Sequence, residues 1–148
     1  MSKVFLDTNI LVYSLDQTDP EKRHRCRELI KGLTAENLGV ISTQVLQEFY
    51  VASTSKLGAD PLIIKDILRS LERFETVIIT PFLIKEAIDC SITNRLSFWD
   101  AMIVVAAESA KCKLLWTEDL NHGQIIRSVR IENPLEIELD TDLHGKSG

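Results

Sequence analysis

Two acidic residues, each placed just after an apolar, strand-like run, are the first candidates for chemistry in this sequence. Asp7 follows the run Val4–Leu6 immediately, and Asp119 comes three positions after the run Leu114–Trp116. In open sheets of parallel strands, ligands bind outside the carboxyl ends of the strands. The two acids could therefore share a site, although each could also be an ordinary turn residue.

Two more acids lie on predicted helices. Glu48 flanks the apolar stripe of a helix that begins near residue 43, and a plain surface position is the alternative explanation for it. Asp100 is the one ionisable residue in the first two turns of a nearly apolar helix that begins at Phe98. A buried charge is costly unless it is paired or metal-bound. Asp100 also lies three residues after Ser97, as in a helix capping box, so that a capping role stays open.

The chemistry that these four acids could perform depends on whether they converge. Carboxylates that share a site repel one another, and such a cluster therefore needs cations. Oxygen ligands without an accompanying set of His and Cys favour Mg²⁺ or Mn²⁺ over Zn²⁺. If the four acids meet, the sequence predicts a divalent-metal site.

The elements that must position the acids alternate between short apolar strands and longer helices. The predicted strands cover residues 4–6, 38–41, 76–79, 114–116 and 129–131, and the predicted helices cover 20–37, 43–57, 61–74, 81–94 and 98–111. This alternation predicts an α/β three-layer sandwich with a central, mostly parallel sheet of four to five strands. We expect one domain over residues 1–139 and a polar, flexible tail over 140–148.

Composition bounds the class of protein. The chain has 148 residues, of which 45% are hydrophobic and 26% are charged, and a net charge of −5. No apolar run approaches the roughly 20 residues that a membrane span needs, so no membrane association is expected. Three cysteines without a close-spaced pair indicate reduced thiols and a cytoplasmic protein. The acidic balance does not point to nucleic acid, but bound divalent cations would restore positive charge where a phosphate must sit.

Four segments of the chain carry a family resemblance. They are FLDTNIL (5–11), TQVLQEFY (43–50), SFWDAMIVVAA (97–107) and LLWTEDLNHGQ (114–124). In these segments and in their order, the chain resembles the PIN-domain nucleases and, among them, the VapC-type toxins of toxin–antitoxin pairs. The resemblance covers the chain to about residue 139, and the predicted fold is PIN-like.

The resemblance implies a function and a set of site residues. The implied activity is metal-dependent endonucleolytic cleavage of RNA with Mg²⁺ or Mn²⁺, and the implied partners are an RNA substrate, a cognate antitoxin and a second copy of the chain. The implied acidic catalytic residues are Asp7, Glu48, Asp100 and Asp119. Of these, the implied metal ligands are Asp7, Asp100 and Asp119. The implied supporting residues are Thr8, Asn9, Thr117 and Asn121, and Glu118 would hold a water or sit on the rim.

Three other functions remain as alternatives. A phosphotransfer enzyme with Asp7 as nucleophile would want an acid at position 9, where Asn9 stands. A receiver-like signalling domain that binds Mg²⁺ would pair two acids near the first strand and place a Lys after the last one, and neither feature is evident. A non-enzymatic RNA-binding scaffold would tolerate loss of the four acids, all of which are present.

Several other side chains have a simpler structural explanation. The basic segment Glu21–Arg27 is expected to be a solvated helix face, with phosphate contact as the alternative. Trp99 and Trp116 are expected to pack in the core or at an interface. Phe49, Tyr50 and the helix 61–74 carry enough apolar surface to suggest a partner.

Overall fold

The computed structural model of the chain describes residues 2–136, with six strands and six helices followed by helical residues at 134–136. The strands are β1 Val4–Leu6, β2 Gly39–Ser42, β3 Glu75–Val77, β4 Leu114–Trp116, β5 Ile125–Ile126 and β6 Val129–Glu132. The helices are α1 Thr8–Tyr13, α2 Pro20–Glu36, α3 Thr43–Ser55, α4 Pro61–Leu71, α5 Pro81–Asn94 and α6 Phe98–Ser109. The predicted tail 140–148 lies outside the described residues.

One sheet organises the molecule, with the strand order β3-β2-β1-β4-β6-β5. Five strands pair in parallel, and β5 pairs antiparallel with β6. The five predicted strands are all present, but the predicted count of four to five is wrong because β5 adds a sixth. The β5–β6 turn places Arg127 and Ser128 at positive φ. Such two-residue turns are signalled in sequence by Asn-Gly or Asp-Gly, and Arg-Ser gives no such signal.

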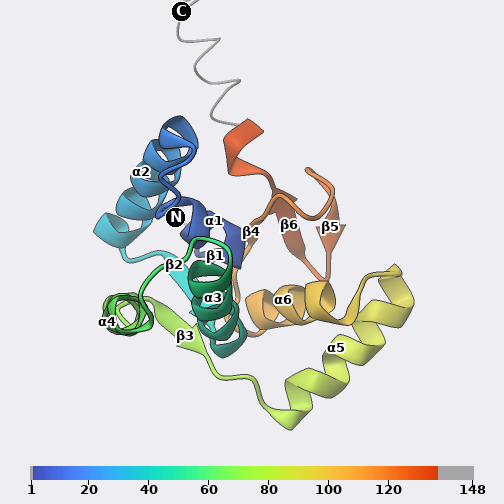
Figure 1. Ribbon diagram of the computed structural model, residues 1–148. Helices are drawn as coiled ribbons and strands as arrows, with labels where there is room; N and C mark the ends of the chain where they lie inside the picture. The colour runs from blue at the N-terminus through green and yellow to red at the C-terminus, as the bar shows by residue number, and fades with distance from the viewer. Residues whose placement is uncertain (1, 137–148) are drawn as a thin grey trace, which may run out of the picture.

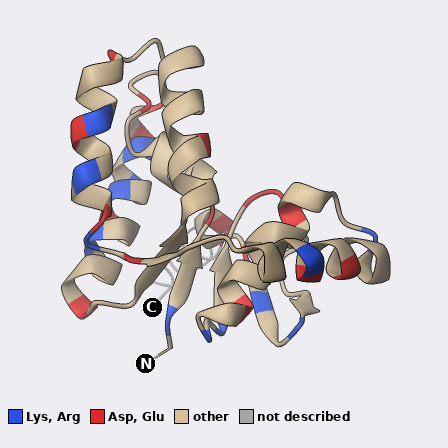
Figure 2. Ribbon diagram, turned by 90° about the horizontal axis from the view of Figure 1, so that it is seen from below, with Lys and Arg blue, Asp and Glu red and all other residues tan. Residues whose placement is uncertain are grey.

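The helices form a layer on each face of the sheet, which confirms the predicted three-layer α/β sandwich. Because parallel crossovers are right-handed, the connections from β1 to β2 and from β2 to β3 put α2, α3 and α4 on one face. The return from β3 to β4 puts α5 and α6 on the other face, where they pack together. In Figure 1 and Figure 2, α4 and α5 accordingly lie on opposite sides of the molecule.

Capping residues fix where most of the helices begin. Asp19, Asp60 and Thr80 are the N-caps of α2, α4 and α5, and each is followed by a proline at the first helical position. Helix α1 was not predicted. Its six residues, TNILVY, are rich in strand-forming types, and it is fixed instead by the side chain of Asp7, which caps it.

The core surrounds the first strand. Residues Val4–Leu6 are buried, and so is the central part of α6, Ala101–Ala107. The strand order reverses between β1 and β4, because the chain first builds outward through β2 and β3 and then returns to the other side of β1. Ligands of open α/β sheets bind at such a switch point. Within residues 2–136, no helix combines the length and apolar character needed to cross a bilayer.

Candidate active site

Asp7 lies at the switch point, directly after β1, and is buried. Its Oδ1 accepts a hydrogen bond from the backbone N–H of Thr8 at 2.7 Å, which caps α1. Its Oδ2 accepts a hydrogen bond from the hydroxyl of Thr117, also at 2.7 Å. Two short bonds from different elements therefore hold this carboxylate in one orientation.

Asp119 comes from the loop after β4, the neighbour of β1. Thr117 joins the two acids, since its hydroxyl donates to Asp7 and accepts the backbone N–H of Asp119 at 3.0 Å. The side-chain amide of Asn9 lies 3.3 Å from each carboxylate oxygen of Asp119. Thr117 thus donates a hydrogen bond to Asp7, and Asn9 donates to Asp119.

Glu48 reaches the same region from α3. Its Oε1 accepts a hydrogen bond from the hydroxyl of Thr8 at 2.9 Å and a longer one from Nε2 of Gln44 at 3.4 Å. Thr8 therefore contributes its backbone to Asp7 and its side chain to Glu48. The first turn of α1 orients two acids at once.

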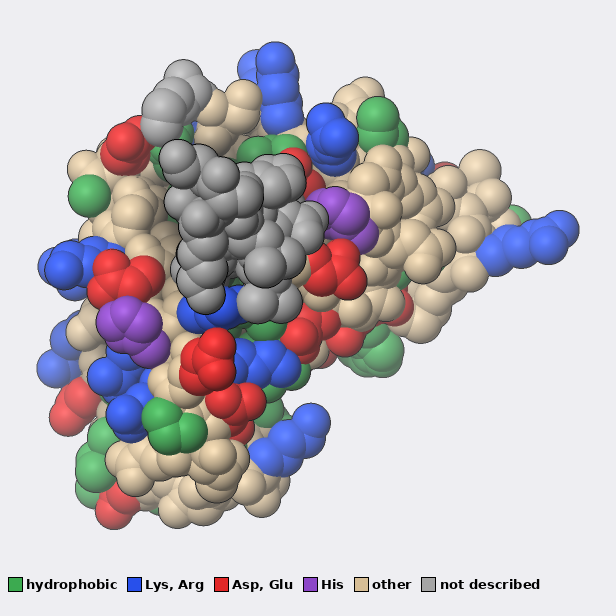
Figure 3. Space-filling view, turned by 90° about the horizontal axis from the view of Figure 1, so that it is seen from above, with side chains coloured by type: hydrophobic (Ala, Val, Ile, Leu, Met, Phe, Trp, Pro, Cys, Tyr) green, Lys and Arg blue, Asp and Glu red, His purple; other side chains and the backbone are tan. Residues whose placement is uncertain are grey.

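Asp100 completes the set from the first turn of α6, where its backbone N–H donates to the side chain of Ser97 at 3.1 Å. Asp7, Glu48, Asp100 and Asp119 all line one pocket of about 160 Å³. The four acids come from the ends of β1 and β4, from α3 and from α6. Figure 3 shows acidic and basic side chains gathered close together on one face of the molecule.

The pocket is electrostatically unbalanced. The pKa of Asp7 is raised from its ordinary value of 3.8 to about 6, chiefly by burial. The hydrogen bonds to Asp7 lower this pKa, and the nearby charges of Asp119 and Glu48 raise it. Burial also raises the pKa of Asp119, with Asp100 adding to the effect and Lys56 opposing it. A cation in the pocket would relieve this repulsion.

The donor set of the pocket fits a hard divalent ion in its chemistry. The candidate ligands are carboxylate oxygens, and no His or Cys lines the pocket in the described part of the chain. Their spacing is more open than a closed metal site: among residues 2–136, no group of three or more His, Cys, Asp or Glu side chains lies close enough to enclose an ion. Mg²⁺ is usually bound by one or two protein carboxylates and keeps several water ligands. Acids spread around a pocket are compatible with this coordination.

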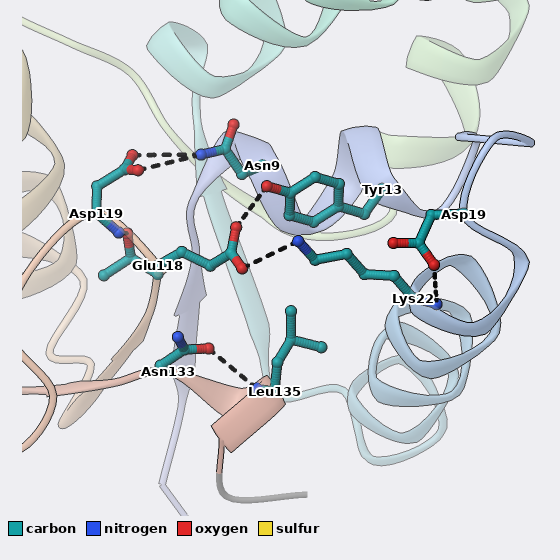
Figure 4. A network of polar contacts seen from close by, with 9 residues as sticks. Asn9, Tyr13, Asp19, Lys22, Glu118, Asp119, Asn133 and Leu135 are labelled. Carbon is teal, nitrogen blue, oxygen red and sulfur yellow. Dashed lines mark hydrogen bonds and ion pairs between the residues drawn. The ribbon is translucent and has the colours of Figure 1, made fainter. Parts of the chain in front are cut away.

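Glu118 and Asn121 lie outside this pocket. Glu118 accepts a hydrogen bond from the hydroxyl of Tyr13, and its other oxygen lies 3.2 Å from Nζ of Lys22. Figure 4 shows Glu118 turned toward these two side chains while Asp119 turns toward Asn9. Asn121 is exposed and does not line the pocket.

The pocket also includes side chains that the sequence did not single out for it. Gln44 and Lys56 lie on the same face of α3 as Glu48, and Trp99 precedes Asp100. Helical spacing from Glu48 to Lys56 was the one available signal for the lysine. Trp99 is 62% exposed and therefore does not pack in the core, so that of the predicted core or interface position only the interface stays a prediction.

Two further expectations have a mixed outcome. Phe49 belongs to the core, whereas Tyr50 and the α4 residues Leu62 and Ile63 are exposed. The basic segment Glu21–Arg27 on α2 contributes no side chain to the acidic pocket.

Comparison with known proteins identifies the family to which this sequence belongs. The sequence model of the PIN domain matches residues 4–127. No curated protein matches the chain in sequence.

Solved structures of low sequence identity share the fold. Mycobacterium tuberculosis VapC20, described as a Sarcin-Ricin loop cleaving toxin, is 17% identical, with a TM-score of 0.63 over 79% of this chain and 92% of that one. The DNA-bound VapBC of Salmonella typhimurium is 20% identical, with a TM-score of 0.64 over 89% and 98%. VapBC2 of Rickettsia felis, bound to a promoter DNA fragment, is 21% identical, with a TM-score of 0.62 over 87% and 96%.

Proposed function

Because the chain belongs to the PIN-domain family, we propose that it is a metal-dependent endoribonuclease and the toxin of a toxin–antitoxin pair. The observation that carries the proposal is the convergence of Asp7, Glu48, Asp100 and Asp119 on one pocket at the switch point of the sheet. The phosphotransfer alternative has less support, since Asn9 stands where such an enzyme would want a second acid.

The metal is proposed to be Mg²⁺ or Mn²⁺, with Asp7, Asp100 and Asp119 as its ligands. The chemistry that such an ion supplies when bound is activation of the attacking water and neutralisation of charge on the phosphate. Thr117 and Asn9 hold the carboxylates of Asp7 and Asp119 in orientation. These fixed contacts leave little reorganisation for the moment of reaction.

Glu48 has a separate proposed role. Both of its hydrogen bonds engage Oε1, so that Oε2 is available to orient a water beside the scissile phosphate. A side chain can take or give a proton only when it lies within hydrogen-bond distance of the reacting group. Gln44 and Thr8, which hold Oε1, are proposed to fix the distance between Oε2 and that water.

Two protein partners belong to the proposal. One solved structure that shares the fold, from Klebsiella pneumoniae, is described as a toxin–antitoxin complex, and we propose a cognate antitoxin for this chain as well. A second copy is proposed to pack on α5, where the exposed side chains Ile84, Ile88 and Ile92 recur at four-residue spacing. Such a stripe suits a two-fold interface between identical helices. Cytoplasmic placement is proposed because the three cysteines are buried and lie far apart in the sequence.

RNA cleavage tests the proposed activity. Purified wild-type protein should cut single-stranded RNA in Mg²⁺ or Mn²⁺, and EDTA should stop the reaction. Duplex DNA in the same buffer should stay intact. The matched variants are Asp7→Asn, in the pocket, and Glu28→Gln, an exposed position on α2 outside it.

The outcome of this comparison is decisive. Asp7→Asn should keep the circular dichroism spectrum of the wild type and lose cleavage, and Glu28→Gln should cut at the wild-type rate. Equal cleavage by Asp7→Asn and wild type, or undiminished cleavage in EDTA, would falsify the proposal.

A further inference from the structure

A second hollow opens beside the acidic pocket, along one face of α3. It has a volume of about 380 Å³ and shares five residues with the acidic pocket. The shared residues are Gln44, Glu48, Ala52, Lys56 and Trp99. We call this hollow the Trp99 groove. Because the two hollows share part of their wall, a ligand in the Trp99 groove lies next to a group bound in the acidic pocket.

Trp99 forms an open aromatic platform in this groove. Its side chain is 62% exposed, although tryptophan is among the residues that gain most from burial. The ring of Phe98 supports it edge-on, with 5.0 Å between centroids and an interplanar angle of 77°. The backbone carbonyl of Trp99 accepts a hydrogen bond from Nε2 of Gln44 at 3.3 Å. The backbone of Trp99 is therefore tied to α3, while most of the residue stays exposed beside the groove.

Gln44 adds an unpaired polar atom at the junction of the two hollows. The residue is 5% exposed and lines both of them. Its Nε2 faces Glu48 and the Trp99 carbonyl, but its Oε1 has no hydrogen-bond partner within residues 2–136. A buried acceptor left unpaired is costly. Because Oε1 is itself enclosed, a donor on a ligand would reach it only after the amide of Gln44 turns toward the groove.

Lys56 supplies positive charge at the same place. Within the described chain, no other Lys or Arg lines either hollow. A cation beside an acidic, metal-binding pocket and an aromatic face matches the combination used to bind single strands, in which a positive charge meets the backbone and bases stack on aromatic rings.

We propose that the Trp99 groove binds one unpaired nucleobase of the RNA substrate, stacked on Trp99, next to the scissile phosphate. Lys56 contacts a neighbouring phosphate, and Gln44 accepts a hydrogen bond from the base. The inference rests on the proposed nuclease function and adds a subsite for the substrate. A protein segment is the less favoured occupant, because the groove contains a cation and amides and runs directly into the acids.

Tryptophan fluorescence tests the stacking directly and without cleavage. The chain has two tryptophans, so Trp116→Phe leaves Trp99 as the sole emitter, and Asp7→Asn blocks cutting. A short single-stranded RNA of mixed sequence should quench the emission of this double variant in Mg²⁺. An RNA of the same length with abasic residues should quench it much less. Equal emission with and without saturating RNA would overturn the inference.

Cleavage kinetics test the same subsite in the active protein. Trp99→Ala should raise KM roughly 10-fold, in line with the loss of one stacked base, and Trp99→Phe should recover most of the loss. Tyr50→Ala, an exposed aromatic on α3 that does not line the groove, should cut RNA like the wild type. An abasic residue next to the cut should cost the wild type the same factor and cost Trp99→Ala little more.

Failure of the inference is distinguishable from failure of the nuclease proposal. RNA cleavage with an unchanged KM in Trp99→Ala would keep the nuclease and overturn the subsite. Quenching of Trp99 by RNA without any cleavage would support the subsite and count against the nuclease. If Trp99→Ala weakened antitoxin binding and left RNA binding unchanged, the groove would be a protein-docking site and the inference would be overturned.

Discussion

Glu118 and Asp119 are neighbours in one loop, yet they belong to two different polar regions. Glu118 faces Lys22 and Tyr13 and is paired with a cation at 3.2 Å. Asp119 faces the acidic pocket, where Asn9 is its side-chain hydrogen-bond donor. Figure 4 shows the two carboxylates turned apart. One loop thus carries a neutralised acid and an acid whose charge is left largely unbalanced.

The difference teaches how to recognise the functional acid. The Glu118 region is complete, since the amine of Lys22 also lies 3.9 Å above the ring of Tyr13, and it ties α1 and α2 to the β4 loop. The acidic pocket is incomplete, because four carboxylates share one lysine. Unbalanced charge is destabilising, and its presence around the buried Asp7 is explained by a ligand that restores the balance.

Replacing the carboxylate by an amide at Asp119 and at Glu118 should give the largest difference in RNA cleavage between the two regions. Asp119→Asn should lower RNA cleavage by about 10³-fold, because a lost metal ligand removes several kcal/mol of charge stabilisation. Glu118→Gln should change it by less than about 3-fold, because Glu118 does not line the acidic pocket. The measurement is kcat/KM on one RNA in Mg²⁺. Similar losses in the two variants would remove the distinction between the regions.

The stability of the metal-free protein should report the strained acid. The folded-state pKa of Asp7, about 6, lies above its ordinary value of 3.8, so its ionisation costs stability. The cost is absent below pH 3.8, grows as pH rises and is complete above pH 6. In EDTA at pH 7.5, Asp7→Asn should therefore be more stable than wild type, by up to about 3 kcal/mol.

Denaturant titrations at several pH values check this expectation. The stability advantage of Asp7→Asn should shrink as pH falls from 7.5 toward 4, and saturating Mg²⁺ should reduce it at pH 7.5. An Asp7→Asn variant that is less stable than wild type at pH 7.5 in EDTA would show that the carboxylate is not strained.

Removing the charge of Glu118 should change the stability of the protein in the opposite direction. Glu118→Gln should destabilise the protein by about 1 kcal/mol, because Lys22 loses its partner in a half-buried ion pair. Thermal or denaturant unfolding in EDTA measures the change, with Glu28→Gln as the exposed control on α2. A gain in stability would place Glu118 among the unbalanced acids instead.

The smallest effect is expected at the lysine that serves the pocket. Lys56→Gln should weaken RNA binding about 3-fold and reduce the slope of log affinity against log salt by about 0.7, the value for one phosphate contact on a single strand. Lys65→Gln on α4, which lines neither hollow, is the matched control. Equal slopes of log affinity against log salt in the two variants would show that Lys56 does not contact the RNA.

Sequence reasoning predicted the elements that have strong local signals. The cap-and-proline pairs at Pro20, Pro61 and Pro81 give the true starts of three helices. The apolar runs before Asp7 and Thr117 are strands of the predicted parallel sheet. Helix α1 and strand β5 were missed, because six and two residues are too short for periodicity to show.

The orientation of side chains was harder to predict than their position. Glu118 and Asp119 differ by one place in the chain, and nothing local says which faces the pocket. The partner that claims Glu118, Lys22, is far away in sequence on α2. The exposure of Trp99 likewise follows from how α6 packs on its neighbours, since Ala101–Ala107 of the same apolar helix are buried. Long-range packing decides these cases, and it is not encoded in any short segment.

Crystals of the wild-type protein soaked in Mn²⁺ test the central claim most directly. Anomalous scattering should give a peak inside the acidic pocket, within coordination distance of Asp7, Asp100 or Asp119, and the peak should be absent from crystals of Asp119→Asn. A pocket without anomalous density at saturating Mn²⁺, or a peak of equal height in the variant, would contradict the account.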